Sequence, residues 1–111
     1  MDAEDQLPGG DEGAGEDRVL EFEWHPGKAA ANLKKHGVSF DEAATIFGDE
    51  NHLVLPDKGH SSEEIRLMAI GRSEGARILT VFFTERGERL RLISARTSEP
   101  WERRAYEIAH E

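Results

Sequence analysis

The sequence predicts a single α+β domain, in which an N-terminal strand and a helix hairpin pack on an antiparallel sheet and a C-terminal helix closes the fold. Three observations predict this architecture. Apolar residues in the first half follow a helical period, those in the second half mostly alternate as in strands, and short turns join the strand-like segments. Short turns favour antiparallel neighbours, so we expect the helices to form a layer on one face of the sheet.

The chain has 111 residues, and the first 17 differ in composition from the rest. Residues 1–17 contain seven acidic residues and four glycines, but no lysine, arginine or aromatic residue. They account for −7 of the formal net charge of −9, which leaves −2 for residues 18–111. Such a segment buries too little apolar surface to offset its chain entropy. We therefore expect an acidic disordered tail over residues 1–17 and one folded domain over residues 18–111.

The composition excludes several classes of protein. The chain has no cysteine, which excludes a disulfide framework, a thiolate zinc site and a cysteine nucleophile. The longest strongly apolar stretch, residues 78–83, is far shorter than the ~20 residues that a membrane helix requires. No basic and apolar secretory signal is recognisable at the start. We therefore expect a cytoplasmic protein with no membrane contact and no cofactor.

The sequence at the start of the folded domain predicts one strand followed by a helix. Residues 19–24 predict a half-buried strand, because apolar residues alternate with glutamates. Residues 28–36 predict a helix, with Pro26 in its first turn and Gly37 as its C-cap. The residues expected on the inner face of this helix are Ala29, Ala30, Ala31 and Leu33.

A second helix is predicted directly afterwards, over residues 39–48. Ser39 and Glu42 have the spacing of a capping box, in which each side chain accepts a hydrogen bond from the backbone N–H of the other residue. Apolar residues follow at helical spacing, and Gly48 ends the pattern. The expected inner face consists of Phe40, Ala43, Ala44 and Phe47. Because almost no chain separates the two helices, we expect them to pack as a hairpin.

The second half of the chain changes to the period of strands. Strands are predicted at residues 53–55, 65–71, 76–84 and 88–96, and a polar loop at 58–64. Residues 76–84 are the most apolar, so we expect this strand at the centre of the sheet. On the last strand, alternation predicts one face with Arg89, Arg91 and Ile93 and another with Leu90, Leu92 and Ser94.

A final helix closes the predicted fold. Residues 97–100 cap and open it, and it extends to about His110. Its apolar residues predict an inner stripe, which consists of Trp101, Ala105, Ile108 and Ala109.

Arginine is concentrated in the second half of the chain. The stretch from residue 66 to residue 104 contains nine arginines, five acidic residues and no lysine. The nine are Arg66, Arg72, Arg77, Arg86, Arg89, Arg91, Arg96, Arg103 and Arg104. A planar guanidinium group matches a phosphate group with two hydrogen bonds, so a sheet with one open face can gather these side chains into a phosphate cradle. The alternative is a solvated surface with salt bridges, which periodicity alone favours.

The histidines carry weaker signals. His36 ends the first predicted helix, where the helix dipole favours a cation; it is either a helix-end residue or a proton donor or phosphate contact. Asp49 with His52, and Asp57 with His60, repeat an acid–histidine spacing that occurs in metal sites. Both pairs lie beside loops and no helix holds either, so we expect no metal site.

No side chain is a nucleophile with an obvious activating partner. RNA, however, carries its own nucleophile, because its 2′-hydroxyl group can attack the adjacent phosphate. The protein then supplies a base, an acid and positive charge for the phosphorane. Glu102 and Tyr106 are four residues apart on the predicted closing helix, with Arg103 beside them, and suit these roles. The alternative for Tyr106 is a half-buried core aromatic residue with a hydrated hydroxyl group.

Five segments of the chain resemble the BrnT toxins. They are Phe-Glu-Trp-His-Pro-Gly-Lys at 22–28, Asn-Leu-Lys-Lys-His-Gly-Val-Ser-Phe-Asp-Glu-Ala at 32–43, Arg66 with Ile70-Gly71, Arg-Leu-Ile-Ser-Ala-Arg at 91–96, and Glu102-Arg103 with Tyr106-Glu107. The resemblance spans about residues 20–107. The runs Lys-His-Gly-Val-Ser-Phe and Arg-x-Ile-Ser-Ala-Arg are its most specific parts.

The resemblance implies a ribonuclease toxin of a type II toxin–antitoxin pair, with a fold similar to that of RelE toxins. It implies an RNA substrate and a BrnA-like antitoxin, a dimeric ribbon-helix-helix protein through which alone the toxin meets operator DNA. It places the RNA site on the open sheet face and the closing helix. The residues carried over by position are Glu102, His36 and Tyr106 as catalytic candidates, and Lys28, Arg72, Arg91, Arg96 and Arg103 as RNA-binding candidates.

Two features depart from the resemblance. His25 stands where the family usually has an aspartate, which removes a favourable helix N-cap. The acidic tail over residues 1–17 is an extension that either folds back over the arginines as a phosphate mimic or is inert. The net charge of −2 for residues 18–111 is low for a nucleic-acid enzyme. It leaves open a non-catalytic, decayed toxin that acts as an antitoxin-binding and operon co-repressor module.

Overall fold

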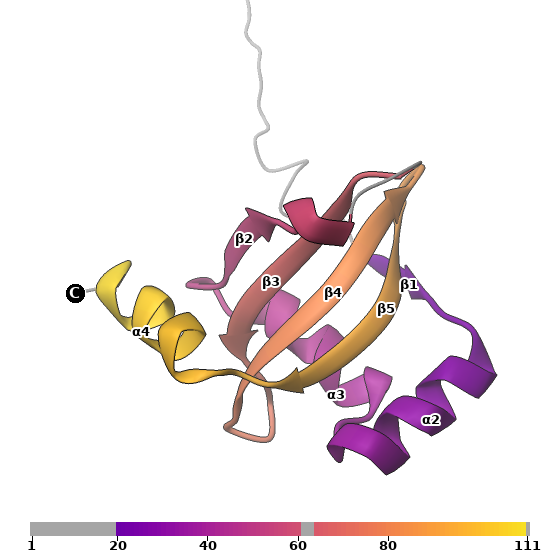
Figure 1. Cartoon of the computed structure of the whole chain (residues 1–111), viewed down its shortest axis with the longest axis horizontal. Helices are drawn as coiled ribbons and strands as arrows, with labels where there is room; N and C mark the ends of the chain where they lie inside the picture. Colours follow the sequence, from indigo (N-terminus) through magenta and orange to yellow (C-terminus); the bar gives the residue numbers. More distant parts are fainter. Residues whose placement is uncertain (1–19, 61–63, 111) are drawn as a thin grey trace, which may run out of the picture.

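The structure, a computed structural model, describes residues 20–60 and 64–110, which form an α+β domain around a five-stranded sheet (Figure 1). The strands are β1 (Glu21–Glu23), β2 (Leu53–Pro56), β3 (Arg66–Arg72), β4 (Ile78–Arg86) and β5 (Arg89–Thr97). The helices are α2 (Pro26–His36), α3 (Phe40–Ala44) and α4 (Pro100–Ile108), with short 3-10 turns η1 (Thr45–Gly48) and η2 (Lys58–His60). None of these helices is long and apolar enough to cross a membrane. The predicted tail, Val19 and residues 61–63 of the predicted loop lie outside the described residues.

The strand order in the sheet is β1-β5-β4-β3-β2, with β4 at the centre as its apolar sequence predicts. The strands from β2 to β5 are antiparallel neighbours, which confirms the prediction from the short turns. The first strand differs, because β1 pairs in parallel with β5 and makes the sheet mixed. No tight turn joins these two strands, so no connection requires them to run antiparallel.

Local hydrogen bonds define both ends of α2. Pro26 occupies the first turn, and Gly37 ends the helix in the left-handed conformation with φ 70°, as predicted. The expected loss of the N-cap at His25 is wrong: its Nδ1 accepts a hydrogen bond of 3.0 Å from the backbone N–H of Gly27. The imidazole nitrogen thus serves as the acceptor that an aspartate oxygen would provide.

The inner face of α2 differs from the predicted one. The exposed residues include Ala30, Ala31 and Leu33. The buried residue is Asn32, whose amide nitrogen donates to the carbonyl oxygens of Val38 and Ala95, each at 2.9 Å. Its amide oxygen accepts from the N–H of Ala95 at 3.1 Å. β1 pairs only with residues 89–91 of β5, so Asn32 satisfies backbone groups of β5 beyond the end of β1.

α3 begins after Ser39, whose Oγ accepts a hydrogen bond of 3.0 Å from the N–H of Glu42, as predicted. The carboxylate of Glu42 does not complete the capping box. It accepts hydrogen bonds from Ser73 Oγ at 2.6 Å and from Arg77 Nε at 3.0 Å. Charge-assisted hydrogen bonds to a guanidinium group are stronger than one to a backbone amide, so the carboxylate turns to Arg77.

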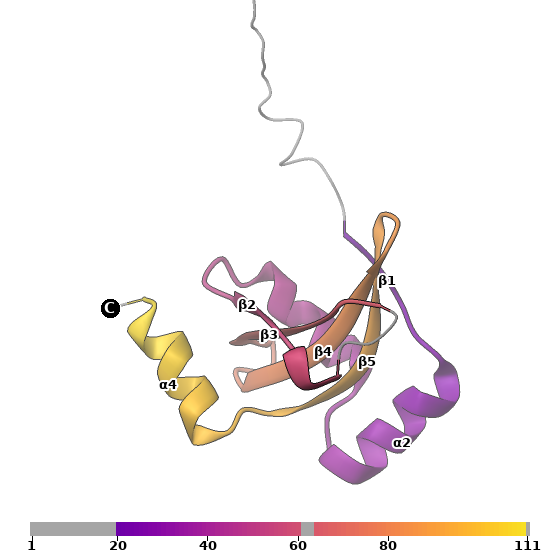
Figure 2. The same cartoon turned by 45° about the horizontal axis from the view of Figure 1, so that its top comes forward.

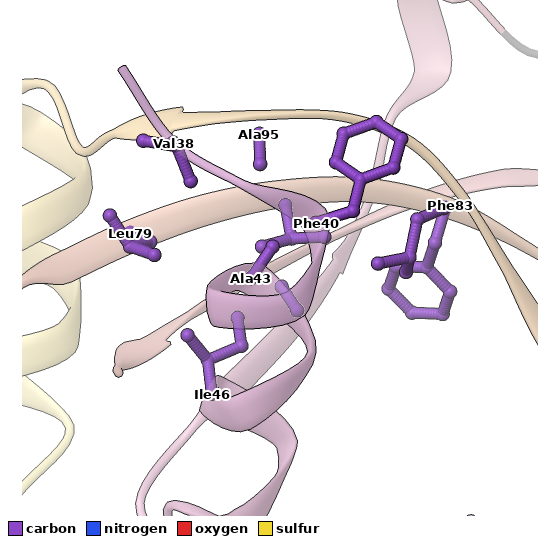
Figure 3. Close-up of a cluster of buried hydrophobic side chains, with 10 residues drawn as sticks. Val38, Phe40, Ala43, Ile46, Leu79, Phe83 and Ala95 are labelled. Atoms are coloured by element: carbon purple, nitrogen blue, oxygen red, sulfur yellow. The ribbon is translucent and has the colours of Figure 1, made fainter. Parts of the chain in front are cut away.

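α3 and η1 cover one face of the sheet and form the larger part of the core (Figure 3). The buried side chains of this cluster are Val38, Phe40, Ala43 and Ile46 against Ala69, Leu79, Val81, Phe83, Leu92 and Ala95. Gly71 of β3 lies directly beneath η1, and a Cβ added there would lie 3.2 Å from the Cβ of Ile46. The close approach of η1 to β3 therefore depends on this glycine.

α4 packs on the opposite face of the sheet, which corrects the prediction that all helices share one face. α2 and α4 also lie at opposite ends of the sheet (Figures 1 and 2). Tyr106 joins a second apolar cluster, whose strand residues alternate with those that face α3. The predicted inner stripe of this helix is wrong as well. Trp101 and Ile108 are each 55% exposed, whereas Glu102 and Tyr106 are buried.

A β-bulge in β5 decides which of its side chains share a face. Consecutive residues of β4, Phe82 and Phe83, pair with Ser94 and Leu92, so Ile93 is an extra residue without a partner in this register. The predicted alternation therefore fails after Leu92, and Ser94 lies on the other face. The side chains of β5 that point away from α3 are Arg89, Arg91, Ser94 and Arg96.

Candidate functional site

The face of the sheet away from α3, called the open face below, carries most of the arginines. Alternation along β3, β4 and β5 directs their side chains there. They are Arg66, Arg72, Arg86, Arg89, Arg91 and Arg96. α4 covers one end of this face, and β1 forms one of its edges (Figure 2).

Arg96 is held by a buried carboxylate on α4. Its Nη1 and Nη2 donate to the two oxygens of Glu102 at 2.7 and 2.9 Å, and Glu102 is fully buried. Glu102 Oε1 also accepts from Thr80 Oγ1 at 2.8 Å and from the N–H of Glu99 at 2.7 Å. Burial disfavours the anion of Glu102, but the hydrogen bonds outweigh it, so the pKa of Glu102 lies below its usual range.

Phe82 lies on the central strand between two of the arginines. The guanidinium carbons of Arg66 and Arg96 are 5.5 and 5.4 Å from the centre of its ring. These arginines come from β3 and β5, the two neighbours of β4, so they approach the ring from both sides. Such cation–π contacts are favourable and hold two planar cations at the centre of the open face.

Acidic residues neutralise the arginines beside β1. Arg89 Nε lies 3.0 Å from Glu21 Oε1, and Arg91 Nη1 lies 2.9 Å from Glu23 Oε2. Further carboxylate pairs on this face join Arg66 to Asp57 and Arg86 to Glu64. The open face therefore combines both sequence expectations: its arginines lie on one surface, and carboxylates of the same chain pair with most of them.

A second polar cluster holds the other end of α4. Tyr106 Oη donates to Asp49 Oδ2 at 2.7 Å, and the same oxygen accepts from the N–H of Arg72 at 2.9 Å. Burial and the bond to Asp49 raise the pKa of Tyr106. Nδ1 of His52 lies 2.8 Å from the carbonyl oxygen of Asp49. Within the described ranges, no group of three or more ligand side chains is placed to hold a metal ion.

A shallow pocket of about 210 Å³, called the basic pocket below, lies between α2 and β5. Lys28, Lys35 and His36 line it from α2, and Ile93 and Ser94 line it from the bulge. Spacings of seven and eight residues place the three basic side chains on one helix face. No acidic side chain among the described residues lines this pocket, in contrast to the open face.

The structure divides the predicted site residues among several places. Arg96 contacts Glu102, Arg72 and Tyr106 meet at Asp49, Lys28 and His36 share the basic pocket, and Arg91 lies beside β1. Arg103 is exposed on α4, and its Nη1 lies 3.4 Å from the carbonyl oxygen of Ser98. The two catalytic candidates of α4 are both buried, but they enter different clusters.

The sequence pattern does not predict Phe82, Thr80 or Asp49 as parts of these clusters. The position of Phe82 could have been predicted. Alternation along β4 places its side chain on the face opposite to that of Phe83, the face that carries arginines of both neighbouring strands. The only sequence pattern that includes Asp49 is its spacing from His52, which suggests a metal ligand rather than a hydrogen-bond partner of Tyr106.

Comparison with known proteins identifies the family. Residues 24–102 match the family described as "Ribonuclease toxin, BrnT, of type II toxin-antitoxin system", a class that implies an antitoxin partner. The crystal structure of the Brucella abortus ribonuclease toxin BrnT is 28% identical, with a TM-score of 0.57, over 73% of this chain and 99% of that chain. No curated protein sequence matches. Because the family match covers most of the chain, the chain belongs to the BrnT family of ribonuclease toxins of type II toxin–antitoxin systems.

Proposed function

We propose that this chain is an endoribonuclease that cleaves RNA without a metal ion, by attack of the RNA 2′-hydroxyl group on the adjacent phosphate. Membership in a family of ribonuclease toxins supports an RNA substrate. The reaction needs a proton-transfer group and cations that stabilise the phosphorane. The chain offers both where the basic pocket meets the open face.

The observation that carries this proposal is that the basic pocket reaches β5 at Ser94, two residues before Arg96. The pocket is lined by Lys28, Lys35 and His36, with no acidic neighbour among the described residues. Ser94 lines the pocket, and Arg96 lies two residues further on the same face of β5, a distance of about 7 Å along the strand. A phosphate group at this junction meets cations from both α2 and β5.

We assign proton transfer to His36 and binding of the scissile phosphate to Lys28 and Arg96. Imidazole is the side chain most suited to accept and return a proton near neutral pH. The two cations stabilise the charge that develops on the phosphorane. Arg91 and Arg103 lie outside this junction and bind flanking phosphates.

We assign positioning roles to Glu102 and Tyr106, in place of the proton transfer expected from sequence. Glu102 is fully buried, and its oxygens accept four hydrogen bonds, so it holds Arg96 and has no contact with solvent. The raised pKa of Tyr106 keeps its hydroxyl group protonated at neutral pH. Through Asp49 this hydroxyl fixes α4 to the end of β3 at Arg72.

The proposal is tested by cleavage of single-stranded RNA in excess EDTA. The purified full chain should leave 2′,3′-cyclic phosphate and 5′-hydroxyl ends, because the 2′-oxygen displaces the 5′-oxygen. His36→Gln should lower the single-turnover rate by about 10²–10⁴-fold, the usual contribution of a general acid–base group. Arg96→Lys should also slow cleavage, because lysine lacks the planar fork of arginine.

Lys34→Gln provides the matched control, because Lys34 lies on α2 outside the lining of the basic pocket. This variant should cleave at the wild-type rate. Cleavage that requires a divalent metal, or products with 3′-hydroxyl ends, would contradict the proposed chemistry. An unchanged rate in His36→Gln would contradict the assigned role of His36.

A second candidate function is a non-catalytic module that binds its antitoxin and helps to repress the operon. The neutralised arginines of the open face favour it, because carboxylates of the same chain occupy groups that RNA would need. A folded wild-type chain that fails to cleave RNA would favour this module. With either function, we propose a dimeric, BrnA-like ribbon-helix-helix protein as the cytoplasmic partner, and contact with operator DNA only through that complex.

A further inference from the structure

We propose that Glu21 and Glu23 of β1 compete with RNA phosphates for Arg89 and Arg91, so that RNA binding requires the exchange of these ion pairs. The inference rests on the proposed function, in which RNA lies along the open face. It adds the residues that limit the affinity of that face.

The ion pairs form a ladder between β1 and β5. The parallel register places Glu21 opposite Arg89 and Glu23 opposite Arg91, with N–O distances of 3.0 and 2.9 Å. Glu23 Oε1 also lies 3.7 Å from Arg89 Nη1. One strand of three residues therefore carries both of the carboxylates that cover these two arginines.

The open face holds its arginines in two distinct ways. Glu102, the partner of Arg96, is only 1% exposed, and loss of Arg96 would leave a buried carboxylate without its counterion, which is costly. The Glu21 side chain is 62% exposed and that of Glu23 is 26% exposed. Both carboxylates reach solvent, so they can return to water when released. The Arg89–Glu21 pair is exposed and contributes little to stability, and the Arg91–Glu23 pair is half-buried. Arg96 is therefore a fixed cation, whereas Arg89 and Arg91 are exchangeable.

A phosphate group is well suited to replace these carboxylates. It offers the guanidinium group the same pair of oxygen acceptors. The surroundings of Arg91 also contain an unsatisfied hydroxyl group. Thr84, its partner in register on β4, is 4% exposed, and its Oγ1 has no hydrogen-bond partner among the described residues.

The test is RNA affinity after removal of both carboxylates in the full chain, with Glu21→Gln and Glu23→Gln combined. The probe is a single-stranded 2′-O-methyl oligonucleotide, which cannot undergo 2′-hydroxyl attack, and fluorescence anisotropy gives Kd over a series of salt concentrations. Binding should tighten about threefold to twentyfold, the range expected when these two ion pairs no longer compete. The slope of log K against log salt should steepen by up to about 1.4, or ~0.7 for each phosphate contact freed from exchange.

Two further sets of variants separate competition from a general change in charge. Asp41→Asn with Glu50→Gln removes the same charge from exposed positions outside β1. The second set combines Arg89→Gln with Arg91→Gln. It is made both in the wild type and in the Glu21→Gln, Glu23→Gln variant, so that the four proteins form a double-mutant cycle. Competition predicts that the gain disappears when both arginines are absent. Circular dichroism verifies that each variant is folded.

The outcomes distinguish this inference from the proposed function. A gain that persists without Arg89 and Arg91, or that the Asp41→Asn, Glu50→Gln control reproduces, overturns the exchange. A wild-type chain that binds and cleaves RNA while the glutamine variant gains nothing overturns the exchange alone. If no variant binds the oligonucleotide and the wild type cleaves no RNA, the proposed function fails as well.

Discussion

The burial of Glu102 determines how rigidly Arg96 is presented to a ligand. A buried carboxylate is tolerated only when its oxygens are satisfied, and here Arg96, Thr80 and Glu99 satisfy them. The guanidinium group is thereby fixed before any ligand arrives, whereas a free arginine would lose side-chain entropy on binding. A preorganised cation of this kind is well suited to stabilise a charge that develops only during a reaction.

Glu102→Gln should lower the free energy of unfolding by about 2–4 kcal/mol at pH 7, because it leaves a partly buried guanidinium group without its counterion. The effect should depend on pH. The pKa of Glu102 is lowered in the folded chain, so its ionisation stabilises the fold above the ordinary glutamate pKa of about 4.3. This stabilisation is lost as the pH falls toward the folded-state pKa. Urea unfolding at pH 7 and at pH 3–4 measures both effects.

Glu107→Gln is the control for this prediction, because Glu107 is exposed on the same helix. It should change stability by no more than about 0.5 kcal/mol. A Glu102→Gln variant as stable as this control at pH 7, or one with the same acid sensitivity as the wild type, would show that the buried pair contributes little.

At the scale of residues, the sequence predicts the residues of the polar clusters better than it predicts the contacts between them. Arg96 and Glu102 are both candidates from sequence, but the end of a strand and the start of a helix share no common period. Their contact therefore has no sequence signal. A role for Glu102 in proton transfer assumes exposure, and burial of a carboxylate depends on partners such as Thr80, which is distant in sequence.

At the scale of elements, apolar periodicity fails for both helices that lie at the ends of the sheet. α2 lies along an edge of β5, where backbone groups need hydrogen bonds, so Asn32 faces inward and Leu33 is 51% exposed. α4 is held by polar anchors, Glu102 and Tyr106, while its Trp101 faces solvent. The middle helix, α3, lies on the sheet, and there all four predicted residues pack in or against the core, although the pattern misses the buried Ile46.

Asn32→Leu should therefore destabilise the fold although it makes α2 more apolar. Leucine has a similar size but cannot bond the N–H and carbonyl oxygen of Ala95 or the carbonyl oxygen of Val38. Unsatisfied buried backbone groups predict a loss of about 2–4 kcal/mol in urea unfolding. Leu33→Ala, which alters an exposed neighbour, should change stability by about 0.5 kcal/mol or less. Equal stabilities of the two variants would refute this anchoring role.

At the scale of the whole molecule, the bulge at Ile93 brings the arginines of β5 to one face. Arg91 and Arg96 are five residues apart, and in a regular strand an odd separation places side chains on opposite faces. The bulge adds one residue, so both arginines point away from α3. Sequence alternation cannot reveal this, because a bulge is seen only in the pairing of two strands.

Deletion of Ile93 should leave the faces of β5 unchanged, because Ser94 would then follow Leu92 in regular alternation. We expect a cooperative thermal transition, with a loss of stability of about 1–3 kcal/mol from the shortened strand. Deletion of Met68 from the regular β3 ladder should behave differently. A shift of one residue there exchanges core and surface side chains, so no cooperative transition is expected. Circular dichroism melting compares the two deletions, and a disordered Ile93 deletion would contradict this account.

The fold as a whole is largely predictable, because its strands and turns depend on local patterns. Residues 76–84 are predicted at the centre by their apolar character, and β4 lies there. The parallel place of β1 is not predictable in the same way. Its three residues show only the alternation of apolar and acidic side chains, and no local pattern predicts that β1 pairs with β5.

This parallel edge has a consequence for the time course of folding. Glu21 and Arg89 are 68 residues apart in the chain, and contacts of such long range form slowly because a large loop must close first. On the ribosome, the first strand emerges long before the last one exists to receive it. The meander from β2 to β5 can assemble by short hairpins, whereas β1 docks last. In a newly made chain, the guanidinium groups of Arg89 and Arg91 therefore lack their partners Glu21 and Glu23 until β1 docks.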